Sequence, residues 1–92
     1  MSIATAFDRA LAEVDRAGRR GLRTRDGAPA DPQIAALRAQ LERAREASLT
    51  RGAIDVAAIG ALVREVAAWY PEDQVQLLAA LGALAAQGGA RT

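Results

Sequence analysis

The chain contains no histidine, no cysteine and no lysine, and only three of its 92 residues are aromatic. It therefore cannot build a Ser–His or Cys–His nucleophile, a zinc site with histidine or cysteine ligands, or a lysine Schiff base. Neither glycine-rich phosphate-loop pattern occurs. The acidic residues are spaced as on solvated helix faces or at helix starts, and none lies within an apolar stripe. The sequence predicts a protein that is not an enzyme and that needs no cofactor or metal.

Long apolar runs are also missing. The two longest, 53–63 and 77–86, fall short of the roughly 18–20 residues that span a bilayer. Residues 1–9 lack the basic start and apolar segment of a signal peptide. The formal net charge of +1 provides no overall field toward nucleic acid or an anionic surface. We therefore expect a cytoplasmic protein that does not bind a membrane.

The residues that are present favour helix. Hydrophobic residues make up 51% of the chain, and many of them are alanine, the strongest helix former. Apolar residues recur at helical spacing in four segments, approximately 2–17, 32–50, 55–70 and 71–87. We predict a single all-α domain over residues 1–92, a small four-helix up-and-down bundle. The third and fourth helices form its central hairpin, and the first two pack on it.

Local signals support these segments. Ser2, Asp31 and Asp55 precede apolar periodic runs and are expected to act as helix N-caps, the second with a proline directly after it. Gly52 is expected to close the second helix, and Gly88-Gly89 to stop the fourth. The segment 18–31, rich in arginine and glycine, is predicted to be a flexible connection.

That connection and the helix before it hold the one local excess of positive charge. No acidic residue interrupts the cluster, which consists of Arg16, Arg19, Arg20, Arg23 and Arg25. Such arginines can bind phosphate or an acidic partner, or they can be a solvated segment neutralised by acids on the neighbouring helices. No aromatic residue is interleaved to stack on bases, so nucleic acid is the less favoured partner.

The apolar surface of the fourth helix is unusually wide. Its large residues spread over about 180° of the circumference, more than one antiparallel neighbour covers. Either two neighbours share this face, or part of it is open to a partner. The second helix has instead a narrow, coiled-coil-like seam. The candidate partner-binding residues on the two helices are Leu77, Leu81, Leu84, Ile34, Leu37 and Leu41.

Two features of the third helix have alternative explanations. Its back face consists mostly of small residues and either tolerates water or lets another helix approach closely. These residues are Ala57, Gly60, Ala61, Ala67 and Ala68. At the end of the third helix, the aromatic pair Trp69 and Tyr70 either packs over the end of the helical hairpin or contributes the main contacts to a partner.

The stretch D-P-Q at 31–33, followed by an Arg/Ala/Leu heptad helix ending in Arg-Gly, resembles the small helical-hairpin co-chaperones of bacterial type III secretion. The resemblance covers residues 31–87. The first helix and Trp69-Tyr70-Pro71 do not fit it, so we assign no residue role from it.

Together these features predict a protein–protein interaction module: an adaptor, a small chaperone or a self-associating subunit. Its partner is another protein or a second copy, bound through apolar helical surface. The alternative is an arginine-mediated binder of nucleic acid or of an acidic partner through residues 16–25.

Overall fold

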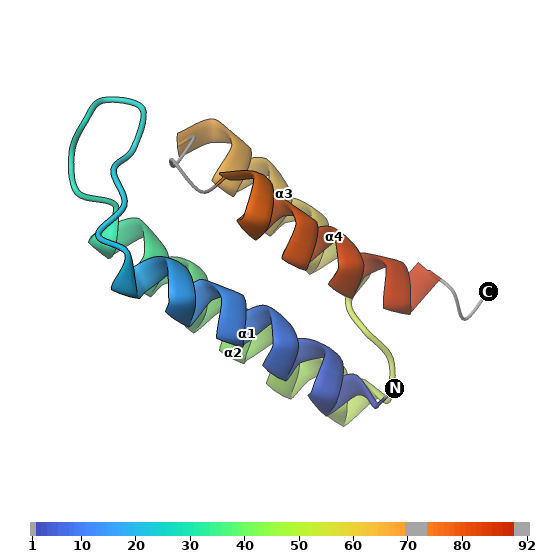
Figure 1. Cartoon of the computed structure of the whole chain (residues 1–92). Helices are drawn as coiled ribbons and strands as arrows, with labels where there is room; N and C mark the ends of the chain where they lie inside the picture. Colours follow the sequence, from blue (N-terminus) through green and yellow to red (C-terminus); the bar gives the residue numbers. More distant parts are fainter. Residues whose placement is uncertain (1, 70–73, 90–92) are drawn as a thin grey trace.

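The computed structural model describes residues 2–69 and 74–89. It contains four helices, α1 (Ile3–Arg19), α2 (Asp31–Arg51), α3 (Val56–Trp69) and α4 (Gln74–Gly89). The described residues form no β-strand beyond one isolated bridge. The predicted all-α, up-and-down bundle is confirmed (Figure 1).

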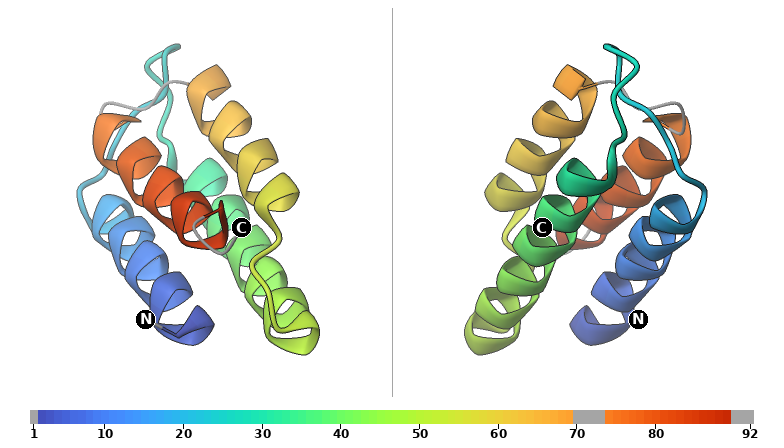
Figure 2. Two further views of the ribbon diagram at one scale, coloured as in Figure 1. Left: turned by 90° about the vertical axis from the view of Figure 1, so that its right-hand side faces the viewer. Right: turned by 90° about the vertical axis from the view of Figure 1, so that its left-hand side faces the viewer.

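The helices form two antiparallel hairpins, α1–α2 and α3–α4, which lie against each other as two layers (Figures 1 and 2). The α3–α4 hairpin is thus confirmed, and α1–α2 is a second hairpin of similar extent. The layers meet chiefly where α1 packs on α4, and less where α2 approaches α3. Because α4 has two helical neighbours, α1 and α3 share most of its wide apolar face, and Val75 at its start stays exposed.

The predicted helix ends are mostly correct. The Ser2 hydroxyl accepts the Thr5 N–H at 3.1 Å, and the Asp55 carboxylate accepts the Ala58 N–H at 3.2 Å. Asp31 is an exception, since Ala30 occupies the N-cap position of α2 without a side-chain hydrogen bond. The carboxylate of Asp31 lies instead in the first turn, where the helix dipole favours negative charge.

A buried serine joins α2 to α3. Ser48 is fully buried, and its hydroxyl accepts the Asp55 N–H at 3.2 Å. Its carbonyl accepts the N–H groups of Gly52 and Ala53. Gly52 takes the left-handed conformation, with φ of 74°, that ends α2. The connection is therefore held from both ends by hydrogen bonds.

The C-terminal end of α4 departs from the prediction. The helix does not stop before Gly88 but continues through both glycines. A Cβ on Gly88 would lie 2.6 Å from Val56 Cγ2 and 3.2 Å from Ile54 Cβ. The glycine therefore permits close packing against the α2–α3 connection, a role that its sequence context does not distinguish from that of a helix stop.

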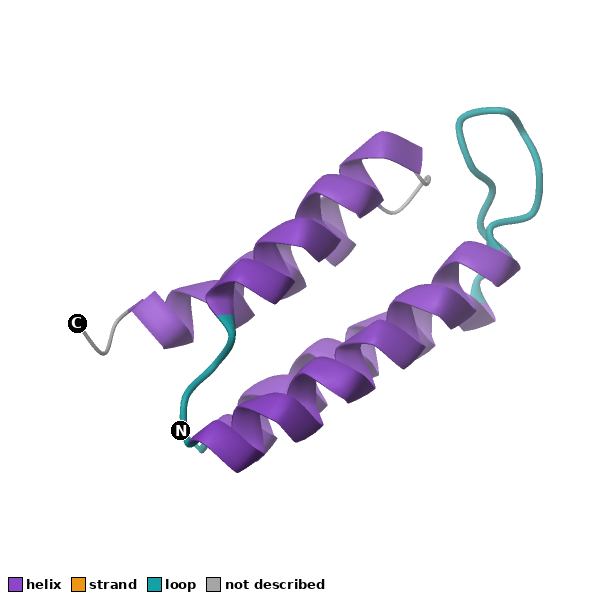
Figure 3. Cartoon of the chain, turned by 180° about the vertical axis from the view of Figure 1, so that it is seen from behind, coloured by secondary structure: helices purple, strands orange, loops and turns teal. Residues whose placement is uncertain are grey.

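The connection between α1 and α2 is a closed loop that projects from one end of the bundle (Figure 3). Thr24 N–H donates to the Ala28 carbonyl, and Ala30 N–H donates to the Leu22 carbonyl, both at 2.9 Å. Leu22 and Ala30 are buried in the core. These contacts close the loop at its base, and its flexibility stays a prediction.

Candidate functional site

The six aliphatic residues predicted to bind a partner lie in the core. Leu77, Leu81 and Leu84 of α4, and Ile34, Leu37 and Leu41 of α2, are between 0 and 6% exposed. The prediction that they form open faces is therefore wrong for this chain. On α4 the reason is that α1 and α3 share the wide face, and on α2 the seam packs chiefly against α1.

The other predicted contact surfaces have mixed outcomes. On the small face of α3, Ala57, Ala61 and Ala68 are exposed, while Gly60 and Ala67 are half-buried. The side chain of Trp69 and the whole of Tyr70 lie outside the described residues.

Large exposed apolar residues do not gather into a patch on one helix. Three stand out, and they belong to three different helices: Leu49, Val56 and Val75. Singly exposed apolar side chains of this kind are normal on a monomer surface. They do not replace the predicted docking face.

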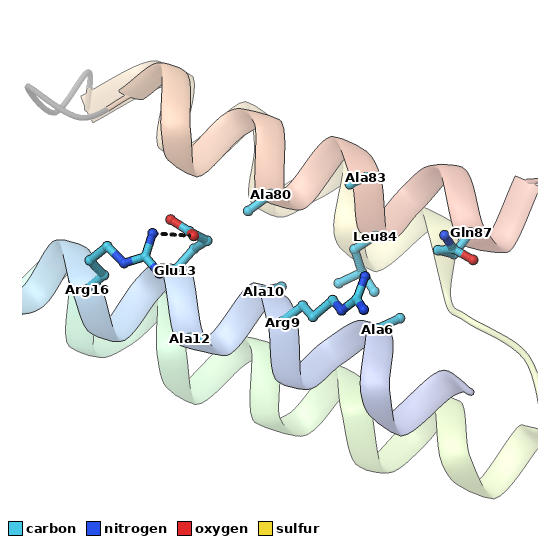
Figure 4. A pocket seen from close by; sticks show the side chains of 10 residues that line it. All are labelled: Ala6, Arg9, Ala10, Ala12, Glu13, Arg16, Ala80, Ala83, Leu84 and Gln87. Carbon is cyan, nitrogen blue, oxygen red and sulfur yellow. Dashed lines mark hydrogen bonds and ion pairs between the residues drawn. The ribbon is translucent and has the colours of Figure 1, made fainter. Parts of the chain in front are cut away.

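A groove with a mostly apolar surface lies between α1 and α4. This groove has a volume of about 400 Å³. Figure 4 shows the ten side chains that line it: Ala6, Arg9, Ala10, Ala12, Glu13 and Arg16 on α1, and Ala80, Ala83, Leu84 and Gln87 on α4.

Small side chains on both helices create this groove. The floor of the groove is formed by side chains that are buried at the contact between the two helices: Ala6, Ala10 and Leu84. On the α4 side, the groove is lined by Ala80 and Ala83 (Figure 4). Because alanine projects only a methyl group, the outer flanks of the two helices leave a furrow between them. This surface is not apparent from the sequence, since its alanines come from opposite ends of the chain and are ordinary helix formers when considered separately.

The charges of the groove all come from α1. Arg16 donates from Nη1 to Glu13 Oε1 at 2.8 Å. Arg9 forms no hydrogen bond or ion pair with any residue that the structure describes. Its side chain extends along the groove toward Leu84 (Figure 4). Two arginines and one glutamate leave the lining with one net positive charge, and the unpaired guanidinium carries it.

The predicted anion-binding arginines lie at one end of the bundle, on the last turns of α1 and on the loop after it. Arg16 is paired with Glu13, and Arg23 donates to the Gly27 carbonyl at 2.8 Å. Arg20 and Arg25 have partners as well. The guanidinium groups of Arg16 and Arg23 are therefore already engaged within the chain.

A second charged surface joins α1 to α2. Arg38 donates to both carboxylate oxygens of Asp15, at 2.7 and 3.4 Å, and pairs with Glu42, as the i,i+4 spacing predicts. Arg45 reaches Asp8 at 3.3 Å. The acids on α1 and the arginines on α2 are each seven residues apart, so they match the antiparallel register. Asp15 raises the pKa of Arg38 through its hydrogen bond and its negative charge.

The described part of the chain carries acidic residues on α1, α2 and α3. No group of three acidic residues there could hold a metal ion. The acids of the α1–α2 surface, Asp8 and Asp15, are paired with arginine.

No helix over the described ranges is long and apolar enough to cross a membrane.

Comparison with known protein families, with curated proteins and with solved structures finds no match. The resemblance of residues 31–87 to secretion co-chaperones therefore gains no support, and the groove between α1 and α4 has to be interpreted from its own geometry.

Proposed function

We propose that this protein is a protein–protein interaction module that binds a helical segment of another protein along the groove between α1 and α4. The observation that carries the proposal is the apolar, alanine-lined furrow of about 400 Å³, open along two exposed helices. We propose this groove as the binding surface in place of the leucine faces on α2 and α4, because those faces are buried.

The geometry suits a third helix. A helix seats in the groove between two others when small residues allow close approach, with axes about 8–10 Å apart. Burial of apolar surface contributes about 25 cal/mol for each Å² removed from water. The aliphatic part of the Arg9 side chain lies along the groove and adds to that apolar area (Figure 4). An adaptor or a small chaperone binds its partner in this helix-in-groove manner.

A photo-crosslinking experiment tests the proposal. A photoreactive phenylalanine derivative replaces Ala83 in the groove or, as a control, Ala47, which is exposed on α2 outside the groove. We expect a crosslinked protein at position 83 only. After identification and purification, that protein should bind the unmodified chain and lose binding to Ala83→Arg.

Two results would contradict the proposal. One is the same set of crosslinks from both positions, which would indicate contact without preference for the groove. The other is a purified partner whose affinity is unchanged by Ala83→Arg, because an arginine at that position fills the furrow and blocks a docked helix.

Binding of nucleic acid or an acidic partner through residues 16–25 is the second candidate. The projection of the arginine-rich loop from the end of the bundle favours it (Figures 1 and 3). The internal partners of Arg16 and Arg23 weaken it, since a ligand would have to compete with them. A salt titration separates the two functions: phosphate binding weakens steeply with salt, whereas apolar docking changes little.

A further inference from the structure

We infer that the helical segment bound in the α1–α4 groove is acidic and places a carboxylate against Arg9. This inference rests on the proposed function and names the chemistry of the partner. It starts from the unpaired guanidinium of Arg9, which lies along a furrow whose other charged side chains, Glu13 and Arg16, pair with each other.

The α1 sequence explains why Arg9 is left without a partner. The only acidic residue lining the groove is Glu13, which stands four residues after Arg9 and three before Arg16. In a helix, an acid that precedes its base is the better arrangement, because it agrees with the helix dipole. Glu13 accordingly pairs with Arg16 at 2.8 Å and leaves Arg9 free for a ligand.

The charge restricts what can cover the groove. A purely apolar helix placed over Arg9 would remove water from a guanidinium without supplying an acceptor, which is costly. A carboxylate supplies two acceptor oxygens that match the planar fork of arginine. The groove is therefore complementary to a helix that presents small apolar residues and one glutamate or aspartate toward Arg9.

The same charge argues against a second copy of this chain. An isologous contact would bring Arg9 and Arg16 of one protomer against the same groove of the other, where the only carboxylate is already paired with Arg16. Each surface carries one net positive charge, so the two would repel each other. A partner with an acidic helix has no such conflict.

The probe is a pair of designed helical peptides of about 14 residues, approximately four turns. Both carry the same alanine and leucine stripe, and they differ only by a central glutamate or lysine at its edge. Binding is measured by fluorescence anisotropy with the unmodified protein, Arg9→Glu, Ala83→Arg and the control Arg43→Glu. Arg43 is an exposed arginine on α2 outside the groove, so its substitution makes the same charge change elsewhere.

We expect the glutamate peptide to bind the unmodified protein about tenfold more tightly than the lysine peptide, as charge-assisted hydrogen bonds imply. Arg9→Glu should reverse this preference, Arg43→Glu should preserve it, and Ala83→Arg should abolish both interactions. Sedimentation of the protein alone should give a monomer.

The outcomes separate this inference from the proposed function. If both peptides bind equally to the unmodified protein and to Arg9→Glu, while Ala83→Arg still blocks them, the groove binds helices but does not select for acid. If neither peptide binds, or if Ala83→Arg has no effect, both ideas are wrong. A dimer that Ala83→Arg disrupts would identify a second copy as the occupant and overturn the acidic partner.

Discussion

Two glycines on α4 should respond in opposite directions to the same substitution. At Gly82, no atom lies within 4 Å of an added Cβ, so Gly82→Ala changes little except the backbone entropy of the unfolded chain and the helix propensity. We expect this variant to be more stable than the parent protein by about 1 kcal/mol. It provides the matched control for Gly88.

At Gly88 the added methyl group meets the α2–α3 connection. Carbon atoms pack best about 3.5–4.0 Å apart. The new Cβ would lie only 2.6 Å from Val56 Cγ2 and 3.2 Å from Ile54 Cβ. Val56 cannot easily rotate away, because a β-branched side chain in a helix has one strongly preferred rotamer. The Ile54 Cβ cannot move away by side-chain rotation either, because it is bonded directly to the backbone.

The expected cost follows from this overlap. Overpacking of one methyl group costs about 1–3 kcal/mol. Helix propensity returns less than about 1 kcal/mol so close to the helix end. Gly88→Ala should therefore lower the free energy of unfolding by about 1 kcal/mol, which corresponds to a fall in Tm of about 4–8 °C for a domain of this size.

The assay is urea unfolding of the parent, Gly82→Ala and Gly88→Ala, monitored by far-ultraviolet circular dichroism. A common slope with shifted midpoints would give the two changes in stability directly. Equal stabilisation by both substitutions would refute the reasoning, since it would mean that the end of α4 does not rest on Ile54 and Val56.

Three further predictions concern the core and the hairpins. Ser48→Ala should destabilise the fold by about 1–2 kcal/mol and speed amide exchange at Asp55, because the half-buried Asp55 N–H loses its acceptor; unchanged exchange would contradict this. Asp15→Ala and Arg38→Ala should show a small favourable coupling in a double-mutant cycle at low salt that disappears at high salt; a salt-independent coupling would exclude an ion pair. Leu77→Asp should lower the free energy of unfolding by at least about 3 kcal/mol, measured by circular dichroism, since the side chain is 1% exposed. A variant that stays folded and loses only the binding of a partner would show that Leu77 is a surface residue.

The helices and most of their ends follow from local signals in the amino-acid sequence. Ser2, Gly52 and Asp55 act through bonds to residues a few positions away, and the apolar periodicity of each segment needs only its own neighbours. Such signals depend only on nearby residues, so they do not depend on how the rest of the chain packs. The same locality explains the error at Asp31, where the preceding alanine takes the cap position and the carboxylate moves into the first turn.

Which surfaces remain open depends on how the helices pack against one another. Leu77 and Leu84 are equally apolar whether α4 has one neighbour or two, and it is the packing of α1 beside α4 that buries them. That same contact brings Ala6 and Ala10 opposite Ala80 and Ala83 and creates the groove. Burial and concavity belong to pairs of helices distant in the chain, and the periodicity of one helix carries no information about which other helix will cover it.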